Sequence, residues 1–264
     1  MKIFKNKKNL QKKISQTKNL SFIPTMGSLH KGHERLIKIA KKKFKKVLVS
    51  IFVNPKQFNS KEDFRSYPRN IKKDINILKR LKVDYVYIPN YFDVFSFKPR
   101  NKVFLHNFSK KLCGQTRKGH FKGVVNVINR FLEIINPKYI LLGKKDFQQL
   151  FLIKKHIEKN KIPTKVISCK TVRDKNGIAL SSRNNNLKEE EFIRLVKIIK
   201  KIKNNKKFMN KIKIIKILNE MFINKVDYIE FLNLNTLKKP INNKTKFNIF
   251  FAFYIGKTRL IDNF

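Results

Sequence analysis

The stretch that most constrains the fold is residues 21–40, which reads as a buried strand, a tight turn and an amphipathic helix. Phe22 and Ile23 close a short apolar run, and Pro24 and Gly27 mark the turn. From Leu29 onward, apolar residues recur at helical spacing. A strand that leads through a turn into a helix favours an α/β fold, provided that strands and helices continue to alternate.

Two histidines, His30 and His33, lie three positions apart in the first turn of this expected helix, where such residues share a face. Free N–H groups and the helix dipole already favour an anion there, and two imidazole donors could follow a phosphate as its charge develops. Gly27 and Gly32 would let a ligand lie against the backbone. Two solvated polar side chains are the alternative, and a bare His-x-Gly-His match does not decide between them.

The first 170 residues continue the alternation. Apolar runs predict strands at 47–53, 85–89, 139–143 and 164–169, and helical spacing predicts helices at 71–81 and 124–135. The run at 47–53 is apolar almost throughout, as in a parallel strand that is buried on both faces. Residues 1–19 read as a short surface helix, and residues 90–111 as irregular.

Beyond Leu187 the pattern changes to two helices, at 188–203 and 211–224, followed by strands at 226–232 and 248–255. We therefore expect an α/β protein with a Rossmann-like, doubly wound parallel sheet in an N-terminal domain, residues 1–170. A smaller α+β domain should cover residues 171–264. Asn- and Lys-rich stretches at 203–213 and 242–246 read as linkers or solvated turns.

The charge is extreme, because 63 Lys and Arg residues face 17 Asp and Glu residues, for a formal net charge of +46. Such a charge ordinarily favours a nucleic-acid partner. The lysines are nevertheless spread over almost every segment, and no nucleic-acid-binding module is recognisable, so we attribute them to an A+T-rich coding bias. The alternative is a nucleic-acid-binding protein built on this α/β scaffold. Strong, salt-sensitive binding of DNA without enzymatic turnover would favour that alternative.

Cysteine use and hydropathy bear on the compartment. The two cysteines, Cys113 and Cys169, lie far apart in unlike contexts, which fits a reducing environment. No apolar run is long enough to cross a bilayer, and the N-terminal residues lack a signal-peptide core. We expect a cytoplasmic protein without a membrane partner.

The string Pro-Thr-Met-Gly-Ser-Leu-His-Lys-Gly-His at 24–33 resembles the nucleotide-binding signature of the pantothenate synthetase (pantoate–β-alanine ligase) family, within the His-x-Gly-His nucleotidylyltransferase superfamily. Four further blocks resemble the same family in the same order, at 49–58, 112–123, 143–149 and 171–184. A nucleotidylyltransferase, the second alternative, would share His-x-Gly-His but lack Asn-Pro-x-Gln-Phe at 54–58 and Lys-Asp-x-Gln-Gln at 145–149. The sequence departs from the family at Lys118 (usually Pro), Lys144 (usually Glu) and Asn176 (usually Asp).

The resemblance implies ATP-dependent condensation of pantoate with β-alanine to pantothenate through a pantoyl adenylate, with release of AMP and pyrophosphate. ATP would be the co-substrate with Mg²⁺, and the enzyme would be a homodimer. No protein ligand of Mg²⁺ is predicted. Asp74 has a family position that can contact magnesium, but an Asp within a helix is more often a surface residue, so it is not counted as a site residue.

By the same resemblance, catalysis falls to His30, His33, Lys145 and Arg183, and pantoate binding to Gln57 and Gln149. The residues implied for ATP binding are Met26, Gly27, Ser28, Leu29, His30, Lys31, Gly32, His33, Gly143, Lys144, Lys145, Asp146, Val172, Leu180, Ser181, Ser182 and Arg183.

These residue types suit the chemistry. A carboxylate that attacks phosphorus needs no base, so the demand falls on alignment and on stabilising the leaving pyrophosphate. Neutral amides such as those of Gln57 and Gln149 can hold a carboxylate without the tight salt bridge that would lower its reactivity. Arg117 and His120, in the block at 112–123, could also face an anionic substrate.

Overall fold

The computed structural model describes residues 1–241 and 245–264, so that 242–244, within the stretch expected to be a turn, lie outside the described residues. The chain divides into two compact units. The first comprises Met1–Ser109 and Arg117–Lys170, and the second comprises Lys110–Thr116 and Thr171–Phe264. By the same family resemblance, residues 1–170 are expected to bind ATP and pantoate and residues 171–264 to form a lid domain, and both roles stay predictions.

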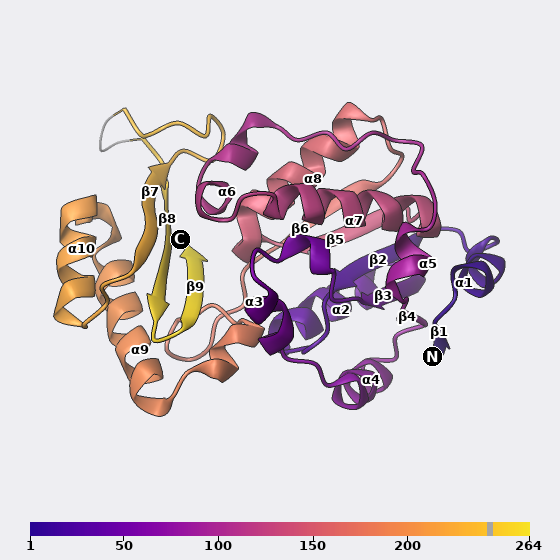
Figure 1. Cartoon of the computed structure of the whole chain (residues 1–264), viewed down its shortest axis with the longest axis horizontal. Coiled ribbons are helices and arrows are strands. Elements are labelled where there is room, and N and C mark those ends of the chain that lie inside the picture. The colour runs from indigo at the N-terminus through magenta and orange to yellow at the C-terminus, as the bar shows by residue number, and fades with distance from the viewer. Residues whose placement is uncertain (242–244) are drawn as a thin grey trace. The chain divides into compact units, whose positions relative to one another are not determined.

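The first unit contains a parallel sheet with flanking helices (Figure 1). Its strands are β1 (Lys2–Phe4), β2 (Leu20–Thr25), β3 (Lys46–Ile51), β4 (Tyr85–Tyr87), β5 (Tyr139–Gly143) and β6 (Lys165–Cys169). Its helices are α1 (Lys7–Ile14), α2 (Lys31–Lys43), α3 (Lys61–Ser66), α4 (Ile71–Arg80), α5 (Tyr91–Phe95), α7 (His120–Ile135) and α8 (Phe147–Lys159).

The strand order is β1-β4-β3-β2-β5-β6, and every pairing is parallel. From β2 the chain builds one side of the sheet through β3 and β4, and β5 and β6 build the other side. The direction therefore reverses between β2 and β5. In doubly wound sheets, ligands bind beyond the carboxyl ends of the strands at such a switch point.

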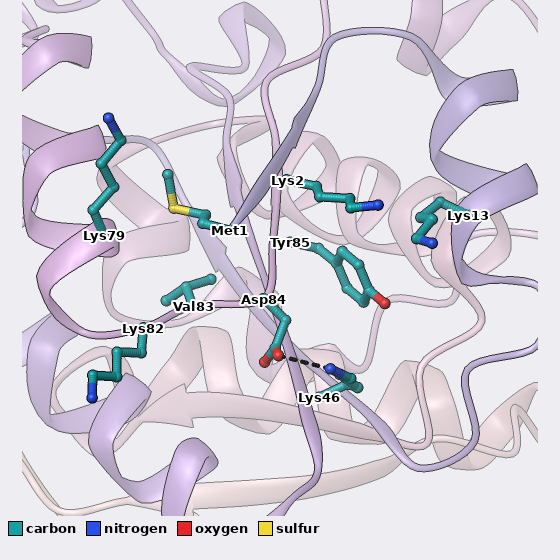
Figure 2. A pocket seen from close by; sticks show the side chains of 9 residues that line it. All are labelled: Met1, Lys2, Lys13, Lys46, Lys79, Lys82, Val83, Asp84 and Tyr85. Atoms are coloured by element: carbon teal, nitrogen blue, oxygen red, sulfur yellow. Dashed lines mark hydrogen bonds and ion pairs between the residues drawn. The ribbon is translucent and has the colours of Figure 1, made fainter.

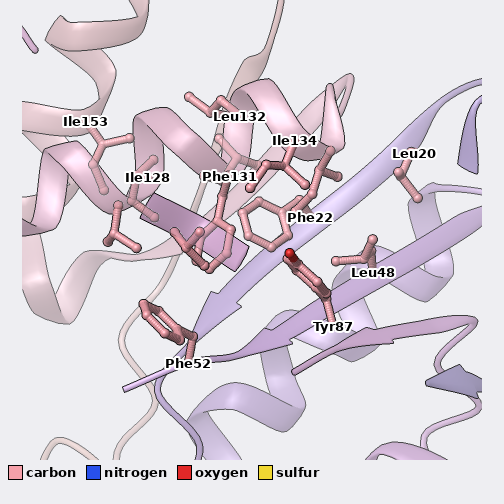
Figure 3. Close-up of a cluster of buried hydrophobic side chains, with 14 of the residues drawn as sticks. Leu20, Phe22, Leu48, Phe52, Tyr87, Ile128, Phe131, Leu132, Ile134 and Ile153 are labelled. Atoms are coloured by element: carbon pink, nitrogen blue, oxygen red, sulfur yellow. The ribbon is translucent and has the colours of Figure 1, made fainter. Parts of the chain in front are cut away.

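Side chains along the strands alternate between two cores, one on each face of the sheet. Phe22 and Leu48 join the core beneath α1, α7 and α8, which Figure 3 shows around Phe131. Their neighbours Ile23 and Val49 join the other core, which includes residues of α2 and α4. Because both faces are covered, the strands are apolar almost throughout, as the sequence indicated.

Two short elements of this unit were not predicted. β1 is an edge strand whose Lys2 pairs with Tyr85 of β4, within a segment that was expected to contain only a helix. Helix α5 lies in the segment that was read as irregular. Both are five residues or shorter, too short for hydrophobic periodicity to reveal them.

The described part of the second unit contains an antiparallel sheet and three helices. Its strands are β7 (Val226–Leu232), β8 (Asn248–Ile255) and β9 (Thr258–Asn263), and its helices are α6 (Cys113–Thr116), α9 (Glu189–Asn204) and α10 (Lys211–Glu220). The last strand, β9, was not predicted. The expected fold class is confirmed, with a Rossmann-like parallel sheet in one part of the chain and a smaller α+β arrangement in the other.

The segment Lys110–Thr116 belongs to the second unit through polar contacts with β7 and β9. The Cys113 thiol lies 3.1 Å from the Tyr228 hydroxyl, and the Thr116 hydroxyl donates to Asp227 at 3.0 Å. Arg259 donates to the same Asp227 carboxylate at 2.7 Å. These partners are more than 100 residues away in the sequence, so local patterns could not assign the segment to this unit. Among the described residues, no helix is both long and apolar enough to span a membrane.

Candidate active site

The candidate site begins where β2 ends. The Thr25 hydroxyl donates to the Ser50 carbonyl at 2.6 Å and accepts from the Gly27 amide at 3.2 Å, which closes the turn. Gly27 and Ser28 then adopt left-handed conformations, with φ of 79° and 51°. A side chain at Gly27 would also lie 2.9 Å from a carboxylate oxygen of Asp74, so this position requires glycine.

His30 and His33 follow this turn and bind the backbone at the start of α2. His30 Nδ1 accepts from the Gly32 amide at 3.0 Å, and His33 Nδ1 accepts from the His30 amide at 3.3 Å. A neutral imidazole that accepts at Nδ1 carries its proton on Nε2. Both rings, whose centroids are 4.1 Å apart, therefore keep an Nε2–H donor for a ligand.

The charge state of the pair follows from its surroundings. Burial, together with the positive charge of Lys145, lowers the pKa of His30 to about 4. Burial, the neighbouring His30 and Lys145 lower the pKa of His33 to about 3. Both rings are therefore neutral hydrogen-bond donors at neutral pH, and Lys145 supplies the fixed cation beside them.

Lys145 comes from the corner after β5, the neighbour of β2 in the sheet. Gly143 ends β5, and Lys144–Asp146 form one turn of 3-10 helix before α8. The Lys145 ammonium lies 3.3 Å from the Asp146 carboxylate, and its side chain is 17% exposed. Lys144 is exposed. The His-x-Gly-His turn and this corner thus flank the switch point between β2 and β5.

Gln57 lies beyond β3 in the turn of 3-10 helix Pro55–Gln57. Its amide nitrogen is 2.7 Å from the Met26 sulfur, which brings the predicted pantoate-binding residue beside the nucleotide turn. Asn54, 1% exposed, donates to the Gln57 side-chain oxygen at 3.4 Å and to the Gly123 carbonyl at 3.2 Å. The oxygen and the nitrogen of the Gln57 side-chain amide are therefore each in contact with a neighbouring side chain.

The start of α7 supports the same residue from behind. His120 Nδ1 lies 2.6 Å from the Gln57 carbonyl oxygen, and Arg117 donates to that oxygen at 3.3 Å. The sequence indicated that both residues could face an anionic substrate, which stays a prediction, and in the structure they also contact the backbone of Gln57. The close approach of α7 also needs Gly123, where a Cβ atom would overlap the Lys56 carbonyl.

Gln149 lies in the first turn of α8, directly after the corner that carries Lys145. Its side chain is half-buried. No polar partner of its amide is found among residues 1–241 and 245–264, which leaves both ends of the amide for a ligand.

The remaining predicted ATP contacts lie in the second unit. The Leu180 amide donates to the Val172 carbonyl at 3.0 Å, so these two residues lie on opposite arms of a loop. The Ser181 hydroxyl accepts from the Arg183 amide at 3.3 Å and caps a turn of 3-10 helix, Ser182–Asn186. Ser182 is buried. Their predicted contact with a nucleotide held by the first unit stays a prediction.

Sequence reasoning missed Asp74 as part of this region. It was taken for a surface residue of α4, yet its side chain is 1% exposed and accepts from the Ser28 and Leu29 amides. The roles of Asn54 and Gly123 were missed as well. Each acts on a residue distant in the sequence, a relation that no local pattern records.

No group of three or more His, Cys, Asp and Glu side chains in the described parts of the chain is arranged to hold a metal ion. A pocket of about 500 Å³ lies at the opposite, amino-terminal edge of the sheet, where β1, β3 and β4 begin (Figure 2). Five lysines line it, and Lys46 binds Asp84 there at 3.1 Å. Because basic residues are spread over almost every segment of this chain, a lining of lysines does not by itself indicate a ligand, and we assign none.

The structure places a two-histidine helix start at the switch point of a parallel sheet, where doubly wound α/β proteins bind their ligands. The sequence of this helix start resembles that of the His-x-Gly-His nucleotidylyltransferase class. Within that class, the family model for pantoate-beta-alanine ligase matches residues 2–264, and the chain belongs to that family.

Individual relatives agree. The chain is 38% identical over 255 residues to a pantothenate synthetase of Clostridium botulinum, covering 93% of this chain and 91% of the relative. A solved pantoate-beta-alanine ligase of Francisella tularensis, complexed with beta-gamma ATP and beta-alanine, is 38% identical with a TM-score of 0.88, over 100% of this chain and 97% of that chain. A pantothenate synthetase of Thermus thermophilus is 26% identical with a TM-score of 0.86, over 100% and 99%.

Proposed function

We infer that this chain catalyses the ATP-dependent condensation of pantoate with β-alanine to pantothenate, with release of AMP and pyrophosphate. Family membership along the whole chain supports the reaction. The observation that supports the placement of its chemistry is the pair of neutral imidazoles beside Lys145, at the sheet's switch point.

In the first step, a pantoate carboxylate oxygen attacks the α-phosphorus of ATP, the bond from that phosphorus to the β-phosphate oxygen breaks, and pyrophosphate leaves. The Nε2–H groups of His30 and His33 donate to phosphate oxygens as negative charge builds on them. Lys145 adds a fixed positive charge. Because these groups are held in place by backbone contacts, they need little reorganisation during the reaction.

Gln57 and Gln149 hold the pantoate carboxylate through neutral amides. Met26, Gly27, Ser28, Leu29, Lys31, Gly32, Gly143, Lys144 and Asp146 complete the nucleotide site in the first unit. Val172, Leu180, Ser181, Ser182 and Arg183, which the family resemblance assigns to ATP binding, belong to the second unit. In the second step the uncharged β-alanine amine attacks the adenylate carbonyl, the amide bond forms, AMP leaves, and the amine gives up a proton.

Mg²⁺ would neutralise charge on the triphosphate. An ion bound through phosphates needs only one or two protein carboxylates. Asp146, with a side chain that is 46% exposed beside Lys145, is the carboxylate of this corner that is open to such an ion. No step above depends on it.

We also propose that the protein is a homodimer and that it lies in the cytoplasm. The family resemblance supports a homodimer, which light scattering on the purified protein would test. Two free, buried cysteines fit the cytoplasm.

Isotope exchange tests the proposed pathway. If the adenylate forms first, labelled pyrophosphate should exchange into ATP with pantoate alone, before β-alanine is added. Replacing Gln149 with Ala should suppress exchange by weakening pantoate, while ATP still binds. Exchange that requires β-alanine, or that proceeds without pantoate, would contradict the adenylate pathway.

A further inference from the structure

Asp74, on α4, is a buried carboxylate whose two oxygens both bind the turn that precedes α2. Oδ2 accepts from the Ser28 amide at 2.9 Å, and Oδ1 accepts from the Leu29 amide at 2.7 Å. The side chain is 1% exposed. A carboxylate that accepts two backbone hydrogen bonds makes charge-assisted contacts, which are stronger than those between neutral groups.

The turn that Asp74 binds is an unfavourable conformation for its sequence. Gly27 and Ser28 are both left-handed, and Ser28 lacks the conformational freedom of glycine. Successive residues of this kind direct their amides toward one point and form a concave anion site. In this protein the anion is one of its own side chains. Asp74 therefore stabilises a conformation that the turn would not readily adopt alone.

This turn leads directly into the catalytic pair. Leu29, whose amide binds Asp74 and whose side chain is buried, is joined by one peptide bond to His30. His30 in turn caps α2 and binds His33 through its own amide. A displacement of the turn would therefore move both imidazoles.

We propose that Asp74 is a positioning residue for adenylate formation, because it holds the turn Gly27–Leu29 and thereby sets the places of His30 and His33. The proposal rests on the function inferred above. It has two consequences. The Ser28 and Leu29 amides are used by Asp74, so these residues shape the nucleotide site without donating their amides to phosphate.

The second consequence concerns magnesium. A carboxylate that is 1% exposed, bound to two amides and next to Gly27 gives no access to an ion that keeps several of its waters. Asp74 therefore acts through the protein backbone, not as a ligand of the metal that its family position suggested.

The test compares Asp74→Asn with Asp84→Asn. Asparagine at 74 keeps the size of the side chain, but its amide group can accept from only one of the two N–H groups. Asp84 is the matched control, because it also accepts a backbone amide, that of Val47 at 3.0 Å, but at the opposite edge of the sheet. We expect Asp74→Asn to lower kcat of pantoate-dependent pyrophosphate exchange by about 10- to 100-fold, the cost of misplaced catalytic groups.

The apparent Mg²⁺ dependence should stay as in the unchanged enzyme. Asp84→Asn should lower the melting temperature but leave kcat unchanged. A folded Asp74→Asn enzyme with unchanged kcat would overturn the proposal, and so would activity that recovers at high Mg²⁺, since that identifies a metal ligand.

A second readout does not depend on activity. Nitrogen-15 NMR of the imidazole rings reports which ring nitrogen is protonated. Asp74→Asn should shift the His30 and His33 signals, and Asp84→Asn should not. If the unchanged enzyme showed no exchange at all, the inferred function would fail, while unmoved ring signals in Asp74→Asn would overturn the positioning role by themselves.

Discussion

His30 and His33, the proposed catalytic pair, each use one ring nitrogen for the backbone and leave the other for a ligand. The Gly32 and His30 amides occupy Nδ1 of His30 and His33, so the tautomer is set by the fold. Burial and Lys145 keep the rings uncharged. At the scale of the residue, the site therefore provides preorganised neutral donors beside one fixed cation.

Substitution of His33 can separate the backbone contact at Nδ1 from the hydrogen-bond donor at Nε2. Asparagine places an oxygen near the position of Nδ1 and can still accept from the His30 amide, but it has no donor at the position of Nε2. Glutamine places its amide nitrogen near the Nε2 position. We expect His33→Asn to lose about two to three orders of magnitude in pyrophosphate exchange, the usual cost of one preorganised donor. His33→Gln should retain more activity than His33→Asn. Equal activity of the folded Asn variant and the unchanged enzyme would contradict the assignment.

Three histidines whose pKa values are lowered by burial should make the fold sensitive to acid. Burial also lowers the pKa of His156 to about 4, and its Nδ1 accepts from the Phe104 amide at 3.1 Å, a contact that protonation would destroy. With His30 and His33, the folded state thus resists protonation at pKa values below the unfolded value of 6.5. The free energy of unfolding should be unaffected by these groups above pH 7 and should fall between about pH 6.5 and 3, the lower end being set by His33.

The contribution of His156 to that fall is about 3 kcal/mol, at about 1.4 kcal/mol for each unit of pKa. Urea unfolding at several pH values measures it. His156→Gln cannot take up the proton, so its stability should depend less steeply on pH across this window. An equal slope in both proteins would contradict the prediction.

At the scale of elements, Gln57, the proposed pantoate-binding residue, depends on the contact of the turn Pro55–Gln57 with α7. Gly123 allows the backbones to approach, and Asn54 donates across the contact to the Gly123 carbonyl. His120 and Arg117 then bind the Gln57 carbonyl. Gln57 is thus positioned by a helix that begins 63 residues later.

Gly123→Ala should disturb this contact, because the new Cβ would overlap the Lys56 carbonyl and lie 2.9 Å from the backbone nitrogen of Gln57. We expect a loss of stability of about 1–3 kcal/mol, typical of overpacking, and a raised KM for pantoate. Gly143→Ala is the control for stability, because no atom lies within 4 Å of a Cβ there. If the two substitutions cost the same in thermal unfolding, backbone approach is not what requires Gly123.

For the whole molecule the dominant property is charge. With 17 acidic residues against 63 basic ones, most lysines have no acidic partner to bind, and a net charge of +46 destabilises the compact state by self-repulsion. The lysines that line the pocket at the amino-terminal edge of the sheet belong to this general surplus.

Added salt should therefore stabilise the protein, because screening acts within about 10 Å at 0.1 M. We expect the melting temperature to rise between about 10 and 300 mM NaCl, because the repulsion between surface charges becomes screened over this range. KCl at equal ionic strength should act alike, since screening does not depend on the identity of the cation. A flat melting temperature would mean that local pairing already neutralises the surface.

The sequence by itself determined the family, the α/β class and the existence of most long elements. Buried strands such as β3 and the amphipathic helices carry their periodicity locally, and the His-x-Gly-His block reports its own helix start. The motif blocks also carried the site residues, whose individual roles stay predictions, as do Mg²⁺, the homodimer and the domain roles. The edge strands β1 and β9 were not predicted, because pairing with β4 and β8, which depends on the fold, decides such strands more than their own residues do.

The tertiary structure alone decided how those residues are held. Asp74 reaches a turn 45 and 46 residues away, and Arg117 and His120 reach the Gln57 carbonyl across about 60 residues. Asp74 was expected at the surface and Arg117 at a substrate, since a polar residue in a sequence does not reveal which distant backbone group it will meet. Hydrogen bonds of this kind depend on the packing of whole elements, and only the folded chain contains that information.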